Sequence, residues 1–385
     1  MSLNRRRFFA NAAVLAAAVP HTLNSLAADE PNRRAVVIGH TGRGDYGHGL
    51  DGIFKDRPGI ELVAVADPDS AGLEKAMVRL GGIRGYADYR EMLAKERPRW
   101  VSVAMRQSDQ HAEIGLACLK AGAHVYMEKP ITRTPAEADA LLAEADRKGL
   151  RIAVAHTMRM TPQVVALRRA VADGLLGELR CMEAWGKQDT RAGGEDMMVL
   201  GSHLFDLMRM FAGDPESVSA EVFEKGRRMT VADRRMVKDN VGWLAGDRVS
   251  ARYQFAGGVE ASFTSDARLR ETVGHWGIRF VGSKGVARLN CDIAPNVFVL
   301  STTGWSATGR VDTWKPLDPA LVGVAPEHNL GPVGDWLKAI ETGRDPECSG
   351  RNAAWAVEMV MGVYASALSG SRTKFPLVNR EHPLG

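Results

Sequence analysis

The stretch "RAVVIGHTGRG", residues 34–44, sets a short apolar run directly before a glycine-rich turn. Gly39, Thr41 and Gly44 occupy the three glycine positions of the G-x-G-x-x-G dinucleotide fingerprint. The first glycine permits a tight turn and the third lets helix and strand pack closely, but Thr41 stands where backbone normally approaches the pyrophosphate. Gly42 lies beside it and can restore the room. The stretch predicts a strand, a phosphate-binding turn and a helix whose N-terminus faces the phosphate, with an ordinary glycine turn as the alternative.

Apolar runs recur downstream and alternate with helical segments. The runs span 60–67, 99–105, 124–128 and 151–156, and the helical segments span 111–122 and 134–149. Continuous apolar strands that alternate with helices indicate a parallel sheet covered on both faces. The sequence therefore predicts an N-terminal α/β domain over 34–157, a doubly wound Rossmann sheet that binds its ligands beyond the carboxyl ends of the strands.

The pattern changes after about residue 158. Longer strands joined by tight Gly-Gly or Ser-Lys-Gly turns fit 178–187, 247–267 and 276–292, and helices fit 330–344 and 352–370. Such hairpins indicate an open, mostly antiparallel sheet. Because 385 residues are too many for one ordinary core, the second half, 158–385, is predicted to be an α+β domain for substrate binding and oligomerisation.

The first residues have the pattern of an export signal. A basic cluster, Arg5 to Arg7, precedes two phenylalanines and an alanine-rich run that is shorter than the about 20 residues needed to cross a bilayer. "NRRRFF" is similar to the twin-arginine signal, and Ser25-Leu26-Ala27 offers cleavage after Ala27. Residues 1–27 are therefore predicted to direct export to the periplasm or an equivalent location. A basic N-terminal helix that stays attached is the alternative.

Composition gives no support to a nucleic-acid-binding protein. The formal net charge is +4, but removing residues 1–27 leaves 47 basic against 46 acidic residues and no basic stripe. The 45% apolar and 25% charged residues are typical of a globular chain. The cysteines have neither metal-ligand nor CxxC spacing, which favours free thiols over a disulfide and predicts no metal site. They are Cys118, Cys181, Cys291 and Cys348.

Asp67 ends the second apolar run, 23 residues after Gly44. A carboxylate near this spacing can accept both adenosine ribose hydroxyls and repels a 2′-phosphate, which favours NAD over NADP. Arg43 weakens that preference, because a guanidinium in the loop can pair with a 2′-phosphate. A simple turn acid before Pro68 is the alternative reading of Asp67.

The run at 124–128 ends in charged residues. Glu128 and Lys129 are followed by Pro130 with no turn residue between, at the carboxyl end where parallel sheets bind ligands. "MEKP", after "HAEIGLACLKAGAHVY", resembles the E-K-P signature of the glucose–fructose oxidoreductase and inositol dehydrogenase (Gfo/Idh/MocA) family, and the resemblance covers 34 to about 370. It implies that Lys129 lies near the nicotinamide and polarises the reacting oxygen. A solvated lysine beside a strand-ending proline is the alternative.

The resemblance extends to "VLGSHLFDLMRMFAG", which starts at Val199 and is similar to the family's D-x-G-x-H-x-x-D helix. It implies that His203 is the general base or acid, a role that suits an imidazole, and that Asp206 supports the fold. A buried structural histidine is the alternative for His203. Val199 replaces the family's first Asp, a carboxylate that would orient the lysine and histidine. Glu195 or Asp196, in the preceding loop, are the candidates to replace it.

Further contacts follow from the resemblance. The loop "AMRQSDQH" lacks the family's usual Thr-Pro-Asn, and "HTMRMTP" resembles a segment whose arginine, here Arg159, lines the substrate pocket. His156 fits equally a polar strand end. Predicted cofactor contacts are Gly39, Thr41, Gly42, Arg43, Gly44, Asp67, Arg106, Gln107, His111, Glu128 and Lys129. Predicted substrate contacts are Arg159, Lys187, Glu195, Asp196 and His203.

Together these features predict an exported NAD(P)-dependent oxidoreductase that acts on a sugar or sugar derivative. Because free nicotinamide cofactor is scarce outside the cytoplasm, we expect the cofactor to stay bound and to be recycled within a redox-neutral cycle. One alternative is an NAD-dependent glycosidase or lyase that oxidises a sugar carbon transiently and eliminates a substituent. Another is a degenerate sugar-binding member, suggested by Val199 and Thr41. We expect no nucleic-acid partner, no stable membrane insertion, and a homodimer or homotetramer.

Overall fold

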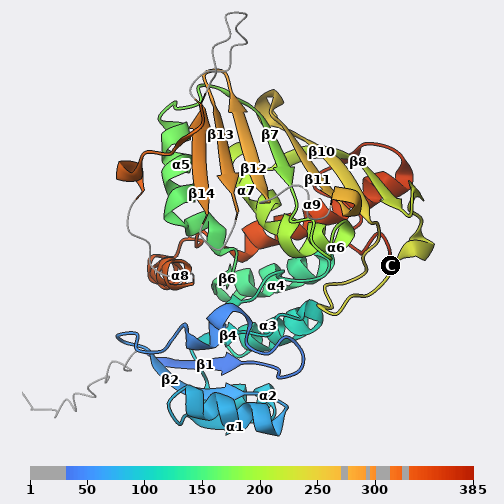
Figure 1. Cartoon of the computed structure of the whole chain (residues 1–385). Helices are drawn as coiled ribbons and strands as arrows, with labels where there is room; N and C mark the ends of the chain where they lie inside the picture. The colour runs from blue at the N-terminus through green and yellow to red at the C-terminus, as the bar shows by residue number, and fades with distance from the viewer. Residues whose placement is uncertain (1–31, 270–275, 292–294, 301–312, 323–328) are drawn as a thin grey trace, which may run out of the picture. The chain divides into compact units, whose positions relative to one another are not determined.

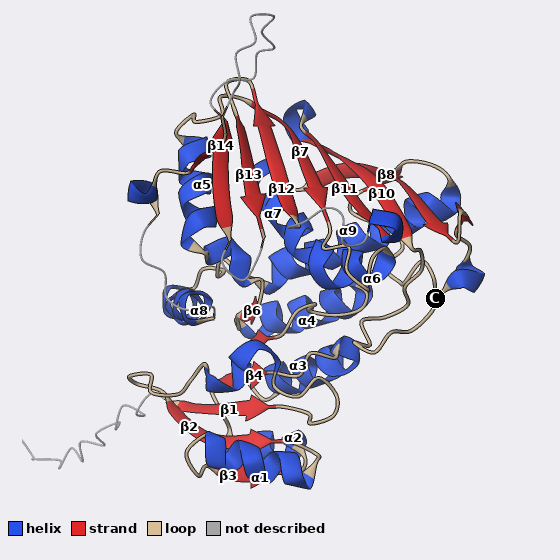
Figure 2. Cartoon of the chain, in the orientation of Figure 1, coloured by secondary structure: helices blue, strands red, loops and turns tan. Residues whose placement is uncertain are grey.

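The computed structural model describes residues 32–269, 276–291, 295–300, 313–322 and 329–385 (Figure 1). The predicted export signal, residues 1–27, lies outside these ranges. In the described part of the chain the strands form two sheets, one of six strands and one of ten (Figure 2). This arrangement confirms the predicted fold class, a Rossmann sheet followed by an open, mostly antiparallel sheet with helices.

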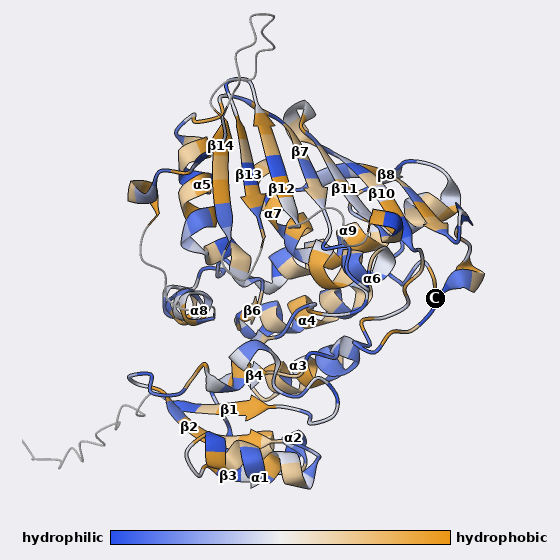
Figure 3. Cartoon of the chain, viewed as in Figure 1, coloured by the Kyte–Doolittle hydropathy of each residue, from blue (hydrophilic) through white to orange (hydrophobic). Residues whose placement is uncertain are grey.

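The first sheet is parallel throughout, with the strand order β3-β2-β1-β4-β5-β6 of dinucleotide-binding Rossmann folds. Its strands are β1 (Arg34–Ile38), β2 (Glu61–Ala66), β3 (Arg84–Tyr86), β4 (Trp100–Val103), β5 (His124–Met127) and β6 (Ile152–Val154). Its helices are α1 (Ser70–Arg79), α2 (Tyr89–Glu96), α3 (His111–Lys120) and α4 (Pro135–Lys148). Strand β1 is hydrophobic and almost completely buried from Ala35 to Ile38 (Figure 3), as expected for a central strand covered on both faces.

The connection between β1 and β2 differs from the prediction. Instead of an α-helix, a short 3₁₀ helix, Gly47–Gly52, follows the glycine-rich turn, and inside it His48 (φ 47°) and Gly49 (φ 74°) have left-handed backbone. The physical reason is local: four glycines and Pro58 fall within residues 45–59, and glycine and proline both disfavour helix. No helix N-terminus is therefore available here for a phosphate, and the predicted one was wrong.

The second sheet has the order β15-β14-β13-β12-β7-β11-β10-β8-β16, with β9 beside β8. Its strands are β7 (Leu179–Trp185), β8 (Pro215–Glu224), β9 (Arg227–Arg228), β10 (Arg248–Phe255), β11 (Glu260–Asp266), β12 (Gly277–Gly282), β13 (Val286–Asn290), β14 (Asn296–Leu300), β15 (Lys315–Pro316) and β16 (Thr373–Lys374). The helices are α5 (Pro162–Ala172), α6 (Gly194–Asp196), α7 (Ser202–Ala212), α8 (Leu330–Thr342) and α9 (Gly350–Ser369). The β7–β11 pair is parallel and the other pairs are antiparallel.

Helix α8 packs on the first sheet although it follows the second in sequence. Trp336 is fully buried with its ring 5.7 Å from that of Tyr126. The Tyr126 hydroxyl donates to Asn329 Oδ1 at 2.8 Å, and Asn329 Nδ2 donates to the carbonyl of His48 at 3.0 Å. Asn329, directly before α8, therefore ties the loop that replaces the first Rossmann helix to strand β5.

Cys118, Cys181 and Cys348 are free thiols, as the absence of paired spacing favoured. Cys118, Cys291 and Cys348 are buried, and Cys181 is partly exposed. Among the helices in the described ranges, none is both long and apolar enough to cross a membrane.

Candidate active site

A cavity of about 410 Å³ opens beside the carboxyl ends of the first sheet. Its wall combines residues that follow β4, β5 and β6 with residues from α7, η4 (the π-helical turn Met197–Gly201) and the loops of the second sheet. The polar and charged wall residues include His48, Arg106, Glu128, Lys129, Lys187, Arg191, His203 and Asp239. The cavity therefore brings together titratable groups from both halves of the chain.

Lys129 follows β5 directly and projects from the end of a buried strand. Its Nζ donates to the carbonyl oxygen of Val199 at 2.9 Å. Burial lowers the pKa of Lys129 below its ordinary value, and the negative charges of Glu128 and Asp239 oppose that shift in part. At the position where the family pattern has an aspartate, a main-chain carbonyl thus fixes the lysine.

His203 lies in the first turn of α7 and lines the same cavity as Lys129. Its pKa is held well below the usual value of an imidazole, first by burial and then by the positive charges of Lys129, His156 and His48. The ring is therefore neutral at pH 7 and can accept a proton. The structure brings the two predicted catalytic residues to one site.

His48 is a cavity residue that the sequence interpretation missed. Its Nδ1 contacts Oε1 of Glu128, a completely buried carboxylate whose Oε2 accepts from the Lys129 amide at 2.7 Å. Burial alone would raise the pKa of Glu128, but the hydrogen bond and charge of His48 lower it overall. The sequence signal that could have pointed to His48 is the pair of glycines on either side of it, Gly47 and Gly49, whereas its left-handed backbone is seen only in the structure.

Asp67 is not placed as the sequence predicted. It is fully buried, and its carboxylate accepts from the Thr41 hydroxyl at 2.7 Å, the Tyr46 hydroxyl at 2.9 Å and the Asp69 amide at 3.0 Å. The Tyr46 ring lies so close to Gly39 that a Cβ added there would be 2.1 Å from it. Asp67 therefore stabilises the glycine-rich turn, and ribose hydroxyls could reach it only by displacing these donors.

The other predicted cofactor residues divide into two groups. Arg43 is paired with Asp109 and hydrogen-bonded to Gln107, so it is engaged rather than open to a 2′-phosphate. His111 is buried, and both of its ring nitrogens contact backbone carbonyls at 2.8 Å, so it is engaged as well. Arg106, in contrast, lines the cavity and contacts the Gly44 carbonyl at 3.3 Å. Nothing lies within 4 Å of a Cβ built on Gly42, so the turn leaves room beside Thr41. Gly42, Arg106 and Lys129 are therefore the predicted contacts that are placed to hold a dinucleotide, whereas Gly44 packs against the Arg106 backbone and Glu128 is engaged by His48.

The predicted substrate residues are only partly in the cavity. Lys187 and His203 line it, whereas its wall in the described residues contains neither Glu195 nor Asp196. Asp196 is fully buried and accepts from the Ser265 hydroxyl at 2.7 Å and from two amides of its own loop, those of Lys187 and Gln188. It therefore anchors a loop and does not replace the carboxylate missing at Val199.

Asp239 is a second carboxylate in the cavity wall beside Glu128, and the ring of Trp276 lies 6.3 Å from that of His203 in the same wall. Neither residue belongs to a recognisable motif. Both lie in loops of the second sheet, and only the fold brings these loops to the cavity.

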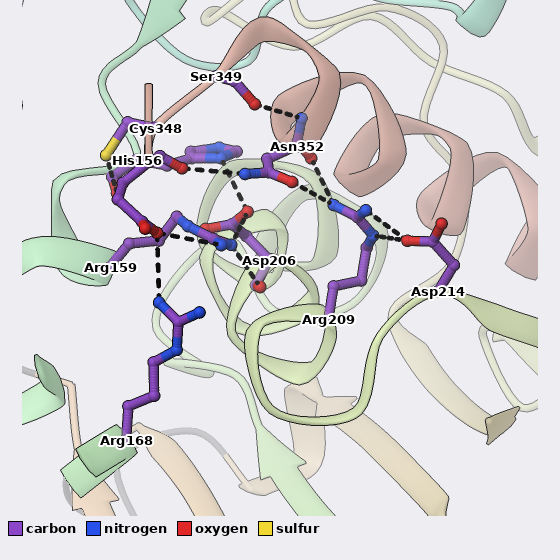
Figure 4. Close-up of polar contacts among 10 residues, drawn as sticks. His156, Arg159, Arg168, Asp206, Arg209, Asp214, Cys348, Ser349 and Asn352 are labelled. Carbon is purple, nitrogen blue, oxygen red and sulfur yellow. Dashed lines mark hydrogen bonds and ion pairs between the residues drawn. The ribbon is translucent and has the colours of Figure 1, made fainter. Parts of the chain in front are cut away.

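Arg159 lies behind the cavity in a buried polar network (Figure 4). Its Nη1 donates to Asp206 Oδ1 at 2.9 Å and to the Asp206 carbonyl at 3.1 Å. The same Oδ1 lies 3.9 Å from Nδ1 of His156, which is also buried. Arg159 is therefore the ion-pair partner of Asp206 and is absent from the cavity wall in the described residues, so its role as a substrate contact stays a prediction that this geometry does not support.

Two family models match these two halves. One, described as the oxidoreductase family with NAD-binding Rossmann fold, matches residues 33–156, and the other, its C-terminal alpha/beta domain, matches residues 161–375. The chain belongs to the Gfo/Idh/MocA family. It is therefore an oxidoreductase of this family, with an NAD-binding Rossmann fold in its first half.

Individual members of the family are more distant. D-apiose dehydrogenase of Paraburkholderia graminis is 24% identical over 354 residues, which cover 86% of this chain and 87% of that protein. The crystal structure of an oxidoreductase domain protein from Kribbella flavida aligns with a TM-score of 0.69 at 25% identity, over 90% of this chain and 99% of that one. Levoglucosan dehydrogenase in complex with NADH and levoglucosan aligns with a TM-score of 0.70 at 20% identity, over 90% and 100% of the two chains, and shows the shared fold.

Proposed function

We propose that this protein is a dehydrogenase of sugars or sugar derivatives that is exported by the twin-arginine route and retains its nicotinamide cofactor. The observation that carries the proposal is the convergence of Lys129 and His203 on one cavity at the carboxyl end of the Rossmann sheet. Two further points support a sugar substrate: Trp276 offers a flat apolar surface, and the relatives include enzymes named for D-apiose and levoglucosan.

In this proposal NAD supplies the hydride acceptor when it is bound. Neutral His203 takes the proton from the substrate hydroxyl, since its lowered pKa leaves a nitrogen lone pair at pH 7. Lys129, fixed by the Val199 carbonyl, places its ammonium beside the same oxygen and stabilises the negative charge that develops there. Asp239 favours the charged form of Lys129 and so keeps this role available.

A second candidate is the redox-neutral lyase or glycosidase cycle. It requires two acid–base groups, one for the hydroxyl proton and one for the neighbouring carbon or the leaving group. The observation that favours it is the second imidazole in the cavity, His48, whose Nδ1 is engaged by the buried carboxylate of Glu128. A carboxylate-oriented histidine is a common form of general base.

We also propose a homodimer or homotetramer that forms through the second sheet. The outward strand residues there are partly or fully exposed, and they carry paired charges such as Arg279 with Glu183 and Arg252 with Glu260. An open face of a ten-stranded sheet that carries such charged pairs is suited to a polar subunit interface. Light scattering of the purified protein at several concentrations tests this expectation.

The central experiment uses protein purified from the exported fraction of its host. We expect mass spectrometry of the released ligands to find a nicotinamide dinucleotide, and D-apiose or levoglucosan, as first probes from a panel of sugars, to change the reduced-nicotinamide absorbance band. The variants Lys129→Met and His203→Phe should abolish the change, whereas Lys148→Met, at an exposed lysine on α4, should not. Absence of a bound dinucleotide would refute cofactor retention, and unchanged absorbance with every sugar in the panel would refute the proposed substrate class.

A further inference from the structure

The side chain next to the His203 ring is a second imidazole, that of His156, and not a carboxylate from the same turn of helix. The rings of His203 and His156 have centroids 5.2 Å apart. Two imidazoles joined by an N–H···N hydrogen bond of about 2.9 Å have centroids about 5 Å apart, because each nitrogen lies about 1.1 Å from its ring centre. The observed separation is therefore short enough for a hydrogen-bonded pair once the two rings, now tilted by 58° to each other, rotate to direct a nitrogen at each other.

Three nitrogens in this pair are enclosed and have no hydrogen-bond partner among the described residues: Nδ1 of His203 and both nitrogens of His156. His156 is 2% exposed, so solvent does not satisfy them. Buried polar atoms without partners are rare and costly in folded proteins, so three in contact call for a shared explanation. Since His203 lines the cavity while its Nδ1 is enclosed, Nε2 is the nitrogen that faces a substrate.

Asp206 adds a buried carboxylate next to His156, so that His203, His156 and Asp206 form a row of three side chains. Asp206 Oδ1 lies 3.9 Å from His156 Nδ1, and a rotation of the ring that brings the two atoms about 1 Å closer forms a hydrogen bond. Arg159 holds the same oxygen at 2.9 Å and also the Asp206 carbonyl, which fixes the carboxylate in place (Figure 4). The charged groups that act on the two rings are Asp206, Arg159, Glu128 and Lys129, with His48 acting on His203. Of these two carboxylates, Asp206 is the one that lies within 4 Å of a ring nitrogen of the pair, Nδ1 of His156, among the residues that the structure describes.

We propose that His156 is a positioning residue that links the catalytic base His203 to Asp206. In this row His203 Nδ1–H donates to His156 Nε2, and His156 Nδ1–H donates to Asp206 Oδ1. Both histidines are then Nδ1–H tautomers, and the lone pair of His203 Nε2 is left pointing into the cavity. The row makes up for the carboxylate that is missing at Val199. In the family pattern that position supplies a negative charge to the histidine, and here the negative charge comes through His156 from Asp206, one turn after His203.

The catalytic consequence rests on the proposed function. When His203 Nε2 accepts a substrate proton, Nδ1 passes its proton to His156 Nε2, and His156 then carries the positive charge with its Nδ1–H directed at the Asp206 carboxylate. One proton enters the row and stays on the imidazoles, and Asp206 remains ionised in its pair with Arg159, so a buried negative charge stabilises the imidazolium that forms. A base that could not pass its charge on would be opposed by burial and by Lys129 alike.

The experiment is ¹⁵N NMR of the imidazoles in the full protein at pH 7, with His203→Gln and His156→Gln spectra used to assign the signals among the ten histidines. Imidazole in water prefers the Nε2–H tautomer, so the predicted Nδ1–H form of both residues is a distinctive signature. His156→Phe keeps a ring of similar size and should return most of His203 to Nε2–H, whereas His156→Gln can accept and donate in turn and should largely preserve Nδ1–H. Cys348→Ala, which removes a thiol 3.4 Å from the His156 carbonyl, is the matched control and should change neither tautomer.

Two results would overturn the proposal: an Nε2–H tautomer for His203 in the wild-type protein, or an unchanged His203 signal in folded His156→Phe. If His156→Phe does not fold, the wild-type tautomers decide alone. No sugar is present in this measurement, so the result does not depend on whether the protein oxidises one. A positive tautomer result with no turnover would refute the proposed function and leave the row intact.

Discussion

Replacing Arg159 by methionine distinguishes a structural role from the substrate-binding role that the sequence suggested. The guanidinium is 7% exposed and its partner Asp206 2% exposed, at 2.9 Å, so the substitution leaves a buried carboxylate without its cation. Breaking a buried pair from one side costs about 3–5 kcal/mol, because the remaining charge has lost both water and partner. We expect the free energy of unfolding of Arg159→Met to fall by about this amount, and the double variant Arg159→Met/Asp206→Leu to recover most of it.

The assay is urea unfolding followed by tryptophan fluorescence and by circular dichroism. Arg168→Met is the control: its pair with Glu347 at 3.3 Å is about half exposed on both sides, and such pairs contribute about 0–1 kcal/mol. The reasoning is refuted if Arg159→Met unfolds like wild type while the KM for a sugar rises, since that pattern belongs to a residue that contacts substrate.

Asp239→Asn should lower the pKa of Lys129 further, because the Asp239 charge raises it, and so move the alkaline limb of the activity–pH profile to lower pH; a limb that moves upward contradicts the assignment. Burial lowers the pKa of His124 in the folded protein to about 4. As the pH falls below about 6.5, the imidazole is therefore protonated in the unfolded chain but still neutral in the folded one. Stability should therefore decline by roughly 1–3 kcal/mol between pH 6.5 and 4, and His124→Asn should lose less over that range in urea titrations. Tyr46→Phe removes one donor from the buried Asp67 and should cost about 1–3 kcal/mol of unfolding free energy, whereas equal stability would mean that this bond is dispensable.

The sequence predicted best where one local signal determines one local structure. Helix α4 begins after Thr134, whose side chain accepts from the Glu137 amide at 3.2 Å, and ends at Gly149 with φ 66°, because capping depends on neighbours within one turn. The hairpin between β10 and β11 turns at Gly257 and Gly258, both with positive φ, for the same reason. The short strand β3 and helices α1 and α2 were missed, since their apolar patterns are weak.

The sequence predicted those parts of the site that belong to recognisable motifs. The signature around Lys129 and the helix with His203 placed both residues at one cavity, but the environment of the other predicted residues depends on contacts distant in sequence. Arg159 and Asp206 are 47 residues apart, and no pattern says that the arginine turns toward the helix rather than toward the substrate. The environment of Asp67 could not be predicted from its spacing, because Tyr46, 21 residues before it, donates a hydrogen bond to the carboxylate that the spacing assigned to a ribose.

The glycine-rich 3₁₀ segment that stands in place of the first Rossmann helix changes how a phosphate can be held. A helix N-terminus attracts anions with oriented dipoles that are fixed in the backbone, whereas this turn has the side-chain cation Arg106 nearby. Attraction between full charges at a partly exposed site weakens as ionic strength rises and the Debye length shortens. Retention of a dinucleotide should therefore be sensitive to the salt content of the surroundings, a condition that varies far more outside the cell than within it.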